Sequence, residues 1–268
     1  MKKRTIRSAS YVYCVTQADE TPSLKRSPRG LPGLGRPRAL QVSPTLWLVV
    51  ADAPLDEYGD AAIHARLQDL EWVGACAAGH ERMIEHVTTA GTTVPMKLFT
   101  LFDSDERAVA NAREMAPKIA RVARRIGGCA EWGVRVHIDE RRARAAARNR
   151  AANALPARAE GMSFLLMKKA EHSGVHQTLR EARRDADRAF SDIAESARES
   201  VRRPPVTREV AARVLLDAVF LVSSGSARQF ESAVRRAKTS LSRNGCEVTL
   251  TGPWPPYHFV DGGRRATR

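Results

Sequence analysis

The sequence predicts an α+β fold of two domains, in which the C-terminal domain is ferredoxin-like (split βαβ) and is followed by an extended Pro-rich C-terminal ribbon. The chain has 268 residues, a length that suits two modest domains, and its 43% hydrophobic content is enough to build their cores. Strand-type alternation and helix-type periodicity succeed one another along the chain. Three prolines within four positions near the end exclude a helix there.

These patterns divide the chain into three parts. We place the N-terminal α+β domain at residues 1–140, an Arg/Ala-rich helical connector at 141–160, and the C-terminal α+β domain with its tail at 161–268. The connector is expected to be helical because alanine has the highest helix propensity. An RNA-binding arginine-rich segment is the alternative interpretation of the same residues.

In the N-terminal domain we expect four strands and two helices. A long basic loop at 17–44, with five prolines and three glycines, separates the first two strands. The strands are recognised by alternating or continuous apolar residues, and the helices by apolar residues three or four positions apart. In chain order these elements are strands at 8–15 and 46–50, a helix at 58–91, a strand at 94–101, a helix at 103–126 and a strand at 131–138.

Some residues here resemble functional motifs but have a simpler structural interpretation. Asp103 and Glu106 have the spacing of a capping box at a helix start. His80 lies on the apolar stripe six residues before His86, whereas a zinc-protease helix needs histidines four apart, so we expect a hydrogen-bonded core histidine. The widely spaced cysteines are expected to be buried thiols: Cys14, Cys76, Cys129 and Cys246.

The C-terminal domain is expected to follow the order βαβ(β)αβ. A strand at 161–167 starts it, a charged helix at 177–201 follows, and an apolar stretch at 210–222 is at least partly strand. A helix at 226–243 and a strand at 246–251 complete the domain. This order is compatible with a split-βαβ, ferredoxin-like sandwich.

The tail that follows the last strand contains the candidate site. Its prolines favour an extended, polyproline-like ribbon with about three residues per turn, which places Trp254, Tyr257 and Val260 on one side with Phe259 beside them. Such a ribbon either contacts a partner or locks the two domains together, with Trp254 as the internal anchor, and we favour the locking role. The candidate residues for either role are Trp254, Pro255, Pro256, Tyr257 and Phe259.

Charge and motif content exclude several classes of function. The formal net charge is +14, but residues 45–100 hold eight acidic and only three basic residues, and aromatic residues make up only 6% of the chain. A dedicated nucleic-acid binder concentrates its charge on one face among stacking aromatics, so an arginine-rich nucleic-acid-binding protein is the alternative rather than the main hypothesis. Gly30, Gly33 and Gly35 do not have the spacing of a phosphate loop.

These observations give four negative expectations. We find no nucleophile motif, metal-ligand set or phosphate loop, and expect no enzymatic activity, no cofactor and no metal. No apolar run is long enough to span a bilayer, and the basic N-terminus lacks a signal-type apolar segment, so we expect a cytosolic protein without a membrane partner.

The residues Thr251-Gly-Pro-Trp-Pro-Pro-Tyr-His-Phe-Val260 resemble the closing signature of the gas vesicle accessory proteins GvpF and GvpL. Shorter pieces resemble the same family in the same order along nearly the whole chain. Asp217 is a departure, because the family tends to have Asn at this position. The matching pieces include Tyr11-Val-Tyr13, Val42-Ser-Pro44, Val94-Pro-Met96, Glu131-Trp-Gly-Val-Arg-Val136, Phe164-Leu-Leu166 and Ala218-Val-Phe-Leu-Val222.

The resemblance implies two α+β domains, the second ferredoxin-like, and no enzymatic activity. It implies a minor component or assembly factor of the gas vesicle, a gas-filled, protein-walled compartment in the cytoplasm. The implied partners are the small, very hydrophobic shell protein and other gas vesicle accessory proteins. It leaves open an F-like or an L-like role and the oligomeric state.

Overall fold

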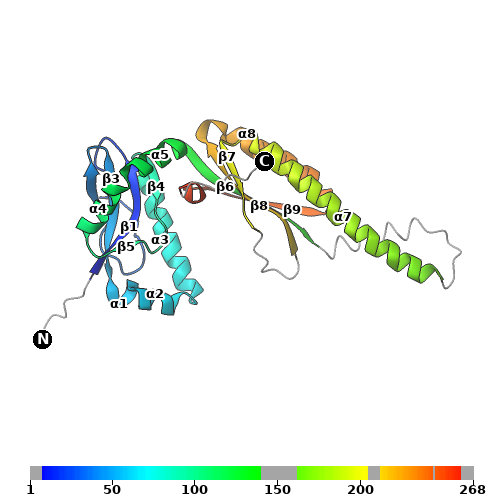
Figure 1. Ribbon diagram of the computed structural model, residues 1–268, viewed down its shortest axis with the longest axis horizontal. Helices are drawn as coiled ribbons and strands as arrows, with labels where there is room; N and C mark the ends of the chain where they lie inside the picture. Colours follow the sequence, from blue (N-terminus) through cyan, green and yellow to red (C-terminus); the bar gives the residue numbers. More distant parts are fainter. Residues whose placement is uncertain (1–7, 140–161, 205–211, 244, 261–268) are drawn as a thin grey trace. The chain divides into compact units, whose positions relative to one another are not determined.

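A computed structural model describes residues 8–139, 162–204, 212–243 and 245–260 (Figure 1). By their contacts the described residues form two compact units, the first made of those in 8–128 and 255–260 and the second of those between 129 and 254. The chain therefore leaves the first unit, builds the second, and returns to the first. The predicted connector at 141–160 lies outside the described residues.

The first unit is built on an antiparallel sheet with the order β2-β3-β1-β4, in which the short β5 also pairs with β1. Its central strand β1 is buried at eight of ten consecutive positions, because helices cover both faces of the sheet. A bulge in β1 lies opposite β3, where the pairing shifts between Val12 and Cys14. The strands are β1 (Ser8–Gln17), β2 (Arg38–Ser43), β3 (Leu46–Pro54), β4 (Thr92–Pro95) and β5 (Leu101–Phe102).

The predictions for 8–15 and 46–50 are confirmed by β1 and β3, but two others were wrong. The strand expected at 94–101 is split into β4 and β5, because the chain turns between them at Phe99, which has a positive φ of 65°. The end of the expected loop is strand β2. It is an edge strand with only one buried residue, Val42, so its sequence lacks a strong strand pattern.

Helices cover both faces of this sheet (Figure 1). The helix expected at 58–91 is divided, because Asp69 caps a new helix by accepting a 3.0 Å hydrogen bond from the Trp72 amide. The N-cap of the next helix is Ser104, which accepts from the Arg107 amide, and not Asp103. The helices are α1 (Leu55–Tyr58), α2 (Asp60–Arg66) and α3 (Leu70–Thr88) around one face, and α4 (Asp105–Glu114) and α5 (Ala116–Ile126) on the other.

An ion pair joins β2 to α4. Arg38 donates from Nε and Nη2 to the two carboxylate oxygens of Asp105, at 3.0 and 2.7 Å, and from Nη2 to Asp52 at 2.8 Å. Burial raises the pKa of Asp105, but hydrogen bonds from Arg38 and Ser10 outweigh it and hold that pKa below its ordinary value. Arg38, in the region expected to be a free basic loop, therefore ties the edge of the sheet to a helix.

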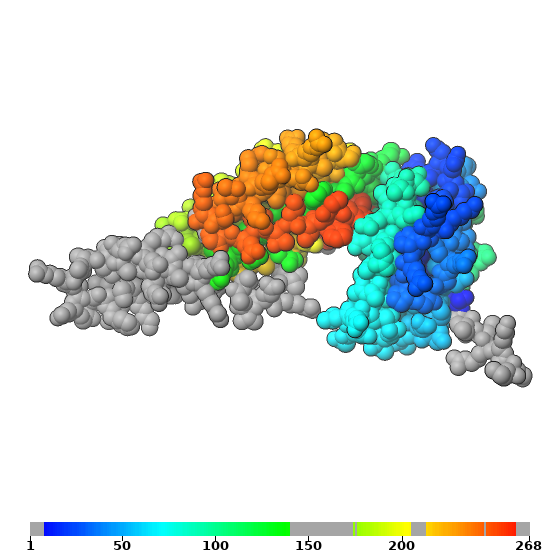
Figure 2. All heavy atoms as spheres, turned by 180° about the vertical axis from the view of Figure 1, so that it is seen from behind, coloured from blue at the N-terminus to red at the C-terminus, as the bar shows by residue number. Residues whose placement is uncertain are grey.

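Residues 18–37 also pack against the first unit. The Tyr58 hydroxyl donates to the Pro32 carbonyl, and Leu31 is buried in the core. A Cβ on Gly79 of α3 would lie only 2.4 Å from the Gly30 carbonyl oxygen, so glycine allows the two backbones to touch. Figure 2 shows this segment (blue) on the surface beside α3 (cyan).

The second unit has the element order β-α-β-β-α-β and an antiparallel sheet with the order β7-β8-β6-β9. Helices α7 and α8 pack against the sheet face that carries Trp132, Val134 and Phe220 (Figure 1). The elements are β6 (Cys129–Asp139), α7 (Met162–Ala194), β7 (Glu199–Arg202), β8 (Ala212–Ser223), α8 (Ala227–Ser242) and β9 (Cys246–Trp254), with a 3₁₀ turn at Ser224–Ser226.

Two sequence predictions fail in this unit. The strand expected at 131–138 exists as β6, but it pairs with β8 and β9 and so belongs to the second sheet. Alternation shows that a segment is a strand but not which strands it pairs with. The strand expected at 161–167 is instead part of α7, because a short apolar run such as Phe164-Leu-Leu166 suits a helix equally well. By contacts the second unit starts at Cys129 rather than at 161.

The structure explains why residue 217 is Asp, where the resembled sequences tend to have Asn. Its side chain is only 3% exposed and lies on the sheet face opposite α7 and α8, as alternation along β8 requires. It accepts hydrogen bonds from Arg135 Nη2 at 3.1 Å and from Arg203 Nε at 2.9 Å. A carboxylate suits this position because two guanidinium groups compensate a buried negative charge.

We predict that Gly79→Ala destabilises the protein by about 1–3 kcal/mol, because the added methyl group must push the loop away from α3. Urea denaturation followed by tryptophan fluorescence measures the change. Gly74→Ala in the same helix is the matched control. Gly74 is exposed, and a methyl group added there would meet nothing within 4 Å, so we expect a gain of about 0.5–1 kcal/mol. Equal effects of the two substitutions would contradict the close-approach explanation.

Candidate partner-binding site

The tail does not form the continuous extended ribbon expected from its prolines. Gly252 to Trp254 remain in β9, where Trp254 pairs with Glu131 at the edge of the sheet. After Pro255 and Pro256 a 3₁₀ turn, η2, forms at Tyr257–Phe259. The prolines exclude an α-helix and a central strand, but an edge strand and a short turn both tolerate them.

The predicted site residues take different environments. Trp254, the expected anchor, is 41% exposed, whereas Phe259 is fully buried at 0%. Pro256 is buried, Pro255 is half-buried, and Tyr257 packs against the core of the first unit. By their contacts residues 255–260 belong to that unit, and the fully buried aromatic residue of the tail is Phe259 and not Trp254.

Beside Tyr257 lies a buried hydrogen-bonded histidine, as the sequence predicts. His80 of α3 lies 2.6 Å from the Tyr11 hydroxyl through Nδ1 and 3.0 Å from the Met96 carbonyl oxygen through Nε2. A carbonyl only accepts, so Nε2 carries the proton and Nδ1 accepts from Tyr11. Tyr257 places its ring 6.3 Å from the His80 ring. The histidine thus joins a helix, a strand and the segment after β4 at the place where the tail packs.

This environment keeps His80 neutral. Burial lowers the pKa of His80 to about 4, and the hydrogen bond to Met96 offsets only part of that effect. Burial also raises the pKa of the Tyr11 hydroxyl above its ordinary value. Within the residues that the structure describes, no three His, Cys, Asp or Glu side chains gather as metal ligands would. The geometry therefore supports a packing role for this histidine.

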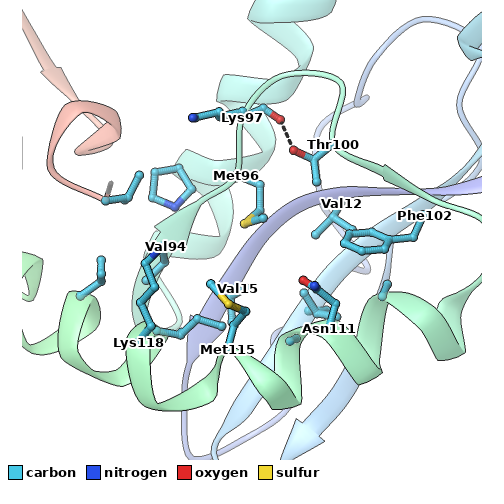
Figure 3. Close-up of a pocket in the computed structure, with 17 residues that line it drawn as sticks. Val12, Val15, Val94, Met96, Lys97, Thr100, Phe102, Asn111, Met115 and Lys118 are labelled. Atoms are coloured by element: carbon cyan, nitrogen blue, oxygen red, sulfur yellow. Dashed lines mark hydrogen bonds between the residues drawn. The ribbon is translucent and has the colours of Figure 1, made fainter. Parts of the chain in front are cut away.

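The first unit also contains an apolar cavity of about 240 Å³ between its sheet and the helices α4 and α5 (Figure 3). Buried side chains of β1 and β4, including Val12, Val15 and Val94, form part of its wall. Met96 and Met115 lie on opposite sides of it. Such a lining suits an apolar group.

The rim of the cavity is more polar than its floor. Lys97, Asn111 and Lys118 are exposed, and Thr100 donates a 2.7 Å hydrogen bond to the Lys97 carbonyl (Figure 3). Val260 of the tail also lines the cavity. Sequence reasoning missed this site, and it predicted a single helix at 103–126 where the structure has α4 and α5, which form one wall. The remaining walls come from segments far apart in the sequence, which local periodicity does not bring together.

The fold defines a class of mixed α/β protein with two units, each built on an antiparallel sheet. A sequence profile of the family described as "Gas vesicle synthesis protein GvpL/GvpF" matches residues 9–261. The chain therefore belongs to the gas vesicle GvpL/GvpF family. This is a family of gas vesicle structural or accessory proteins, not a known enzyme family.

Individual proteins agree with this assignment. The chain is 30% identical over 256 residues to gas vesicle protein L of a Streptomyces species, covering 93% of this chain and 92% of that protein. It is 24% identical over 266 residues to gas vesicle protein L2 of Halobacterium salinarum, covering 93% and 90%.

Solved structures share the fold. The crystal structure of GvpF from Anabaena matches with a TM-score of 0.69 at 14% identity, over 97% of this chain and 99% of that one. GvpF from Microcystis aeruginosa matches with a TM-score of 0.64 at 14% identity, over 94% and 98%. Across the described ranges, none of the helices combines the length and the apolar character needed to cross a membrane.

We predict that acid destabilises the protein through His80. Its native pKa of about 4 lies below the ordinary value of 6.5, so the unfolded state binds a proton first as the pH falls. The stabilising contribution of neutral His80 is complete above pH 6.5 and is lost between pH 6.5 and pH 4, by roughly 3 kcal/mol at most. Urea denaturation between pH 6.5 and pH 4 should show that the free energy of unfolding falls less in His80→Gln than in the wild type. His64→Gln, which changes an exposed histidine, should keep the full loss; equal slopes for both variants would contradict the assignment.

We predict that Phe259→Ala destabilises the first unit by about 3–5 kcal/mol, because the side chain is fully buried. Amide hydrogen exchange should show lost protection in α3 and β1. Trp254→Ala is the control, and we expect a cost below about 1 kcal/mol at this partly exposed position. Unchanged protection in the Phe259 variant would show that the tail does not anchor there.

Proposed function

We propose that this protein is a gas vesicle accessory or minor structural protein, located at the gas vesicle in the cytoplasm. In this role it binds the small hydrophobic shell protein and assists vesicle assembly. Membership of the GvpL/GvpF family supports the setting. The apolar cavity of about 240 Å³ is the main observation that supports a binding role, because its lining can accommodate an apolar group of a partner.

A binding role of this kind meets a physical need. A subunit with a large apolar face aggregates in water unless another surface covers that face. A groove that accepts apolar side chains from a partner segment provides such cover. Because the attraction is hydrophobic, its strength should depend little on salt.

We further infer how the tail contributes. Tyr257 and Phe259 would lock the tail on the first unit, with Pro255 and Pro256 restricting its path. Trp254 is exposed and would be available for direct contact with a partner. The order β-α-β-β-α-β with the strand order β7-β8-β6-β9 supports a ferredoxin-like, split-βαβ assignment for the second unit.

The test follows light scattering of the shell protein from the same organism after dilution from denaturant. We expect the wild-type chain to suppress scattering at both low and high salt. Trp254→Ala should weaken suppression without loss of stability, whereas Tyr257→Ala should weaken it together with stability. No suppression, combined with nucleic-acid binding that falls steeply with salt, would favour the arginine-rich nucleic-acid-binding alternative.

A further inference from the structure

We propose that the cavity between the sheet and α4–α5 binds one apolar side chain from a segment of the shell protein whose neighbouring residues are acidic. This inference rests on the proposed function and adds to it the place of contact and the chemistry of the partner segment. Cavity size, an adaptable lining and a cationic rim carry it.

The size of the cavity fits a side chain. Protein interiors are close-packed and contain few voids larger than a water molecule. An engineered apolar cavity of about 150 Å³ stays dry and binds benzene. The present cavity is larger, at about 240 Å³, so it has room for a branched aliphatic or an aromatic side chain.

The lining can adapt to the group that enters. The floor is formed by buried aliphatic residues of the sheet, among them Val12 and Leu48, which fix its shape. Met96 and Met115 lie half-exposed on opposite sides of the opening (Figure 3). Methionine is unbranched and flexible, so these two side chains can close around groups of different shape.

The basic residues on the rim favour a partner segment that carries negative charge. Lys97 and Lys118 both line the cavity and are exposed at its edge. Helix α5, which carries Lys118, contains no acidic residue, and the acidic residue closest to Lys118 in the sequence is Glu114 at the end of α4. In the part of the chain that the structure describes, Lys118 forms no ion pair. Carboxylates beside the inserted side chain would therefore meet a cationic rim.

The tail completes the site. Val260, the last residue that the structure describes, forms part of the lining. It follows directly after the buried Phe259, so its position depends on the anchoring of the tail. The same C-terminal residues that pack the first unit would thus also shape the entrance for the partner.

The test measures binding of the shell protein, kept soluble as a fusion with a carrier protein, by thermophoresis at 50 mM and 500 mM salt. We expect the double variant Lys97→Glu, Lys118→Glu to bind about tenfold more weakly at low salt, and the loss to shrink at high salt. We expect Asn111→Trp, which obstructs the opening from an exposed position, to weaken binding about tenfold at both salt concentrations. Melting curves check that each variant is folded.

Matched controls separate the site from general charge effects. Arg124→Glu reverses an exposed charge on the helix that carries Lys118, away from the cavity lining, and should bind as the wild type does. Replacing a contacting Asp or Glu of the shell protein by Lys should restore binding to the double lysine variant. Wild-type affinity in both the lysine variant and Asn111→Trp would overturn this site but leave the proposed function standing. No binding by the wild-type chain would overturn both.

Discussion

The packing of the tail residues 255–260 with the first unit is the constraint that joins the two ends of the described chain. This unit takes its other described residues from positions up to 128, yet one fully buried aromatic side chain, Phe259, comes from the tail after the second unit. Tyr257 adds a ring beside His80, and Val260 reaches the wall of the apolar cavity. Core packing and the shape of the candidate site therefore depend on the same short segment. A change in the tail acts on both, because densely packed cores transmit strain.

His80 shows how the unit tolerates a polar group at this junction. Both ring nitrogens have partners, one on β1 and one on the segment after β4, so the desolvation cost of burying the ring is offset. Glycine has a similar role on the outer side of α3, where Gly79 lets the loop backbone touch the helix. In both places the first unit is held together by contacts between segments that are distant in sequence.

Local patterns in the sequence predicted the local elements well. The apolar runs of β1 and β3 sufficed to predict those strands, and the apolar stripe placed His80 correctly in the core. Two predictions failed because local periodicity was not sufficient. Strand β6 alternates as expected but pairs in the second sheet, and the short apolar run Phe164-Leu-Leu166 suits a helix as well as a strand. The anchoring of Phe259 and the cavity arise from long-range packing, which has no local signature.

The return of the chain to its first unit also sets an order of events during synthesis. The second unit is, in sequence, an insertion within the first, and the pairing of Glu131 with Trp254 brings its entry and exit points together. Domains generally fold as they leave the ribosome, N-terminal ones first. Here Phe259 and Val260 are synthesised after β9, so the first unit gains these two residues only after all strands of the inserted unit have been made. A chain that stopped before Phe259 would lack both this buried side chain and the wall residue Val260.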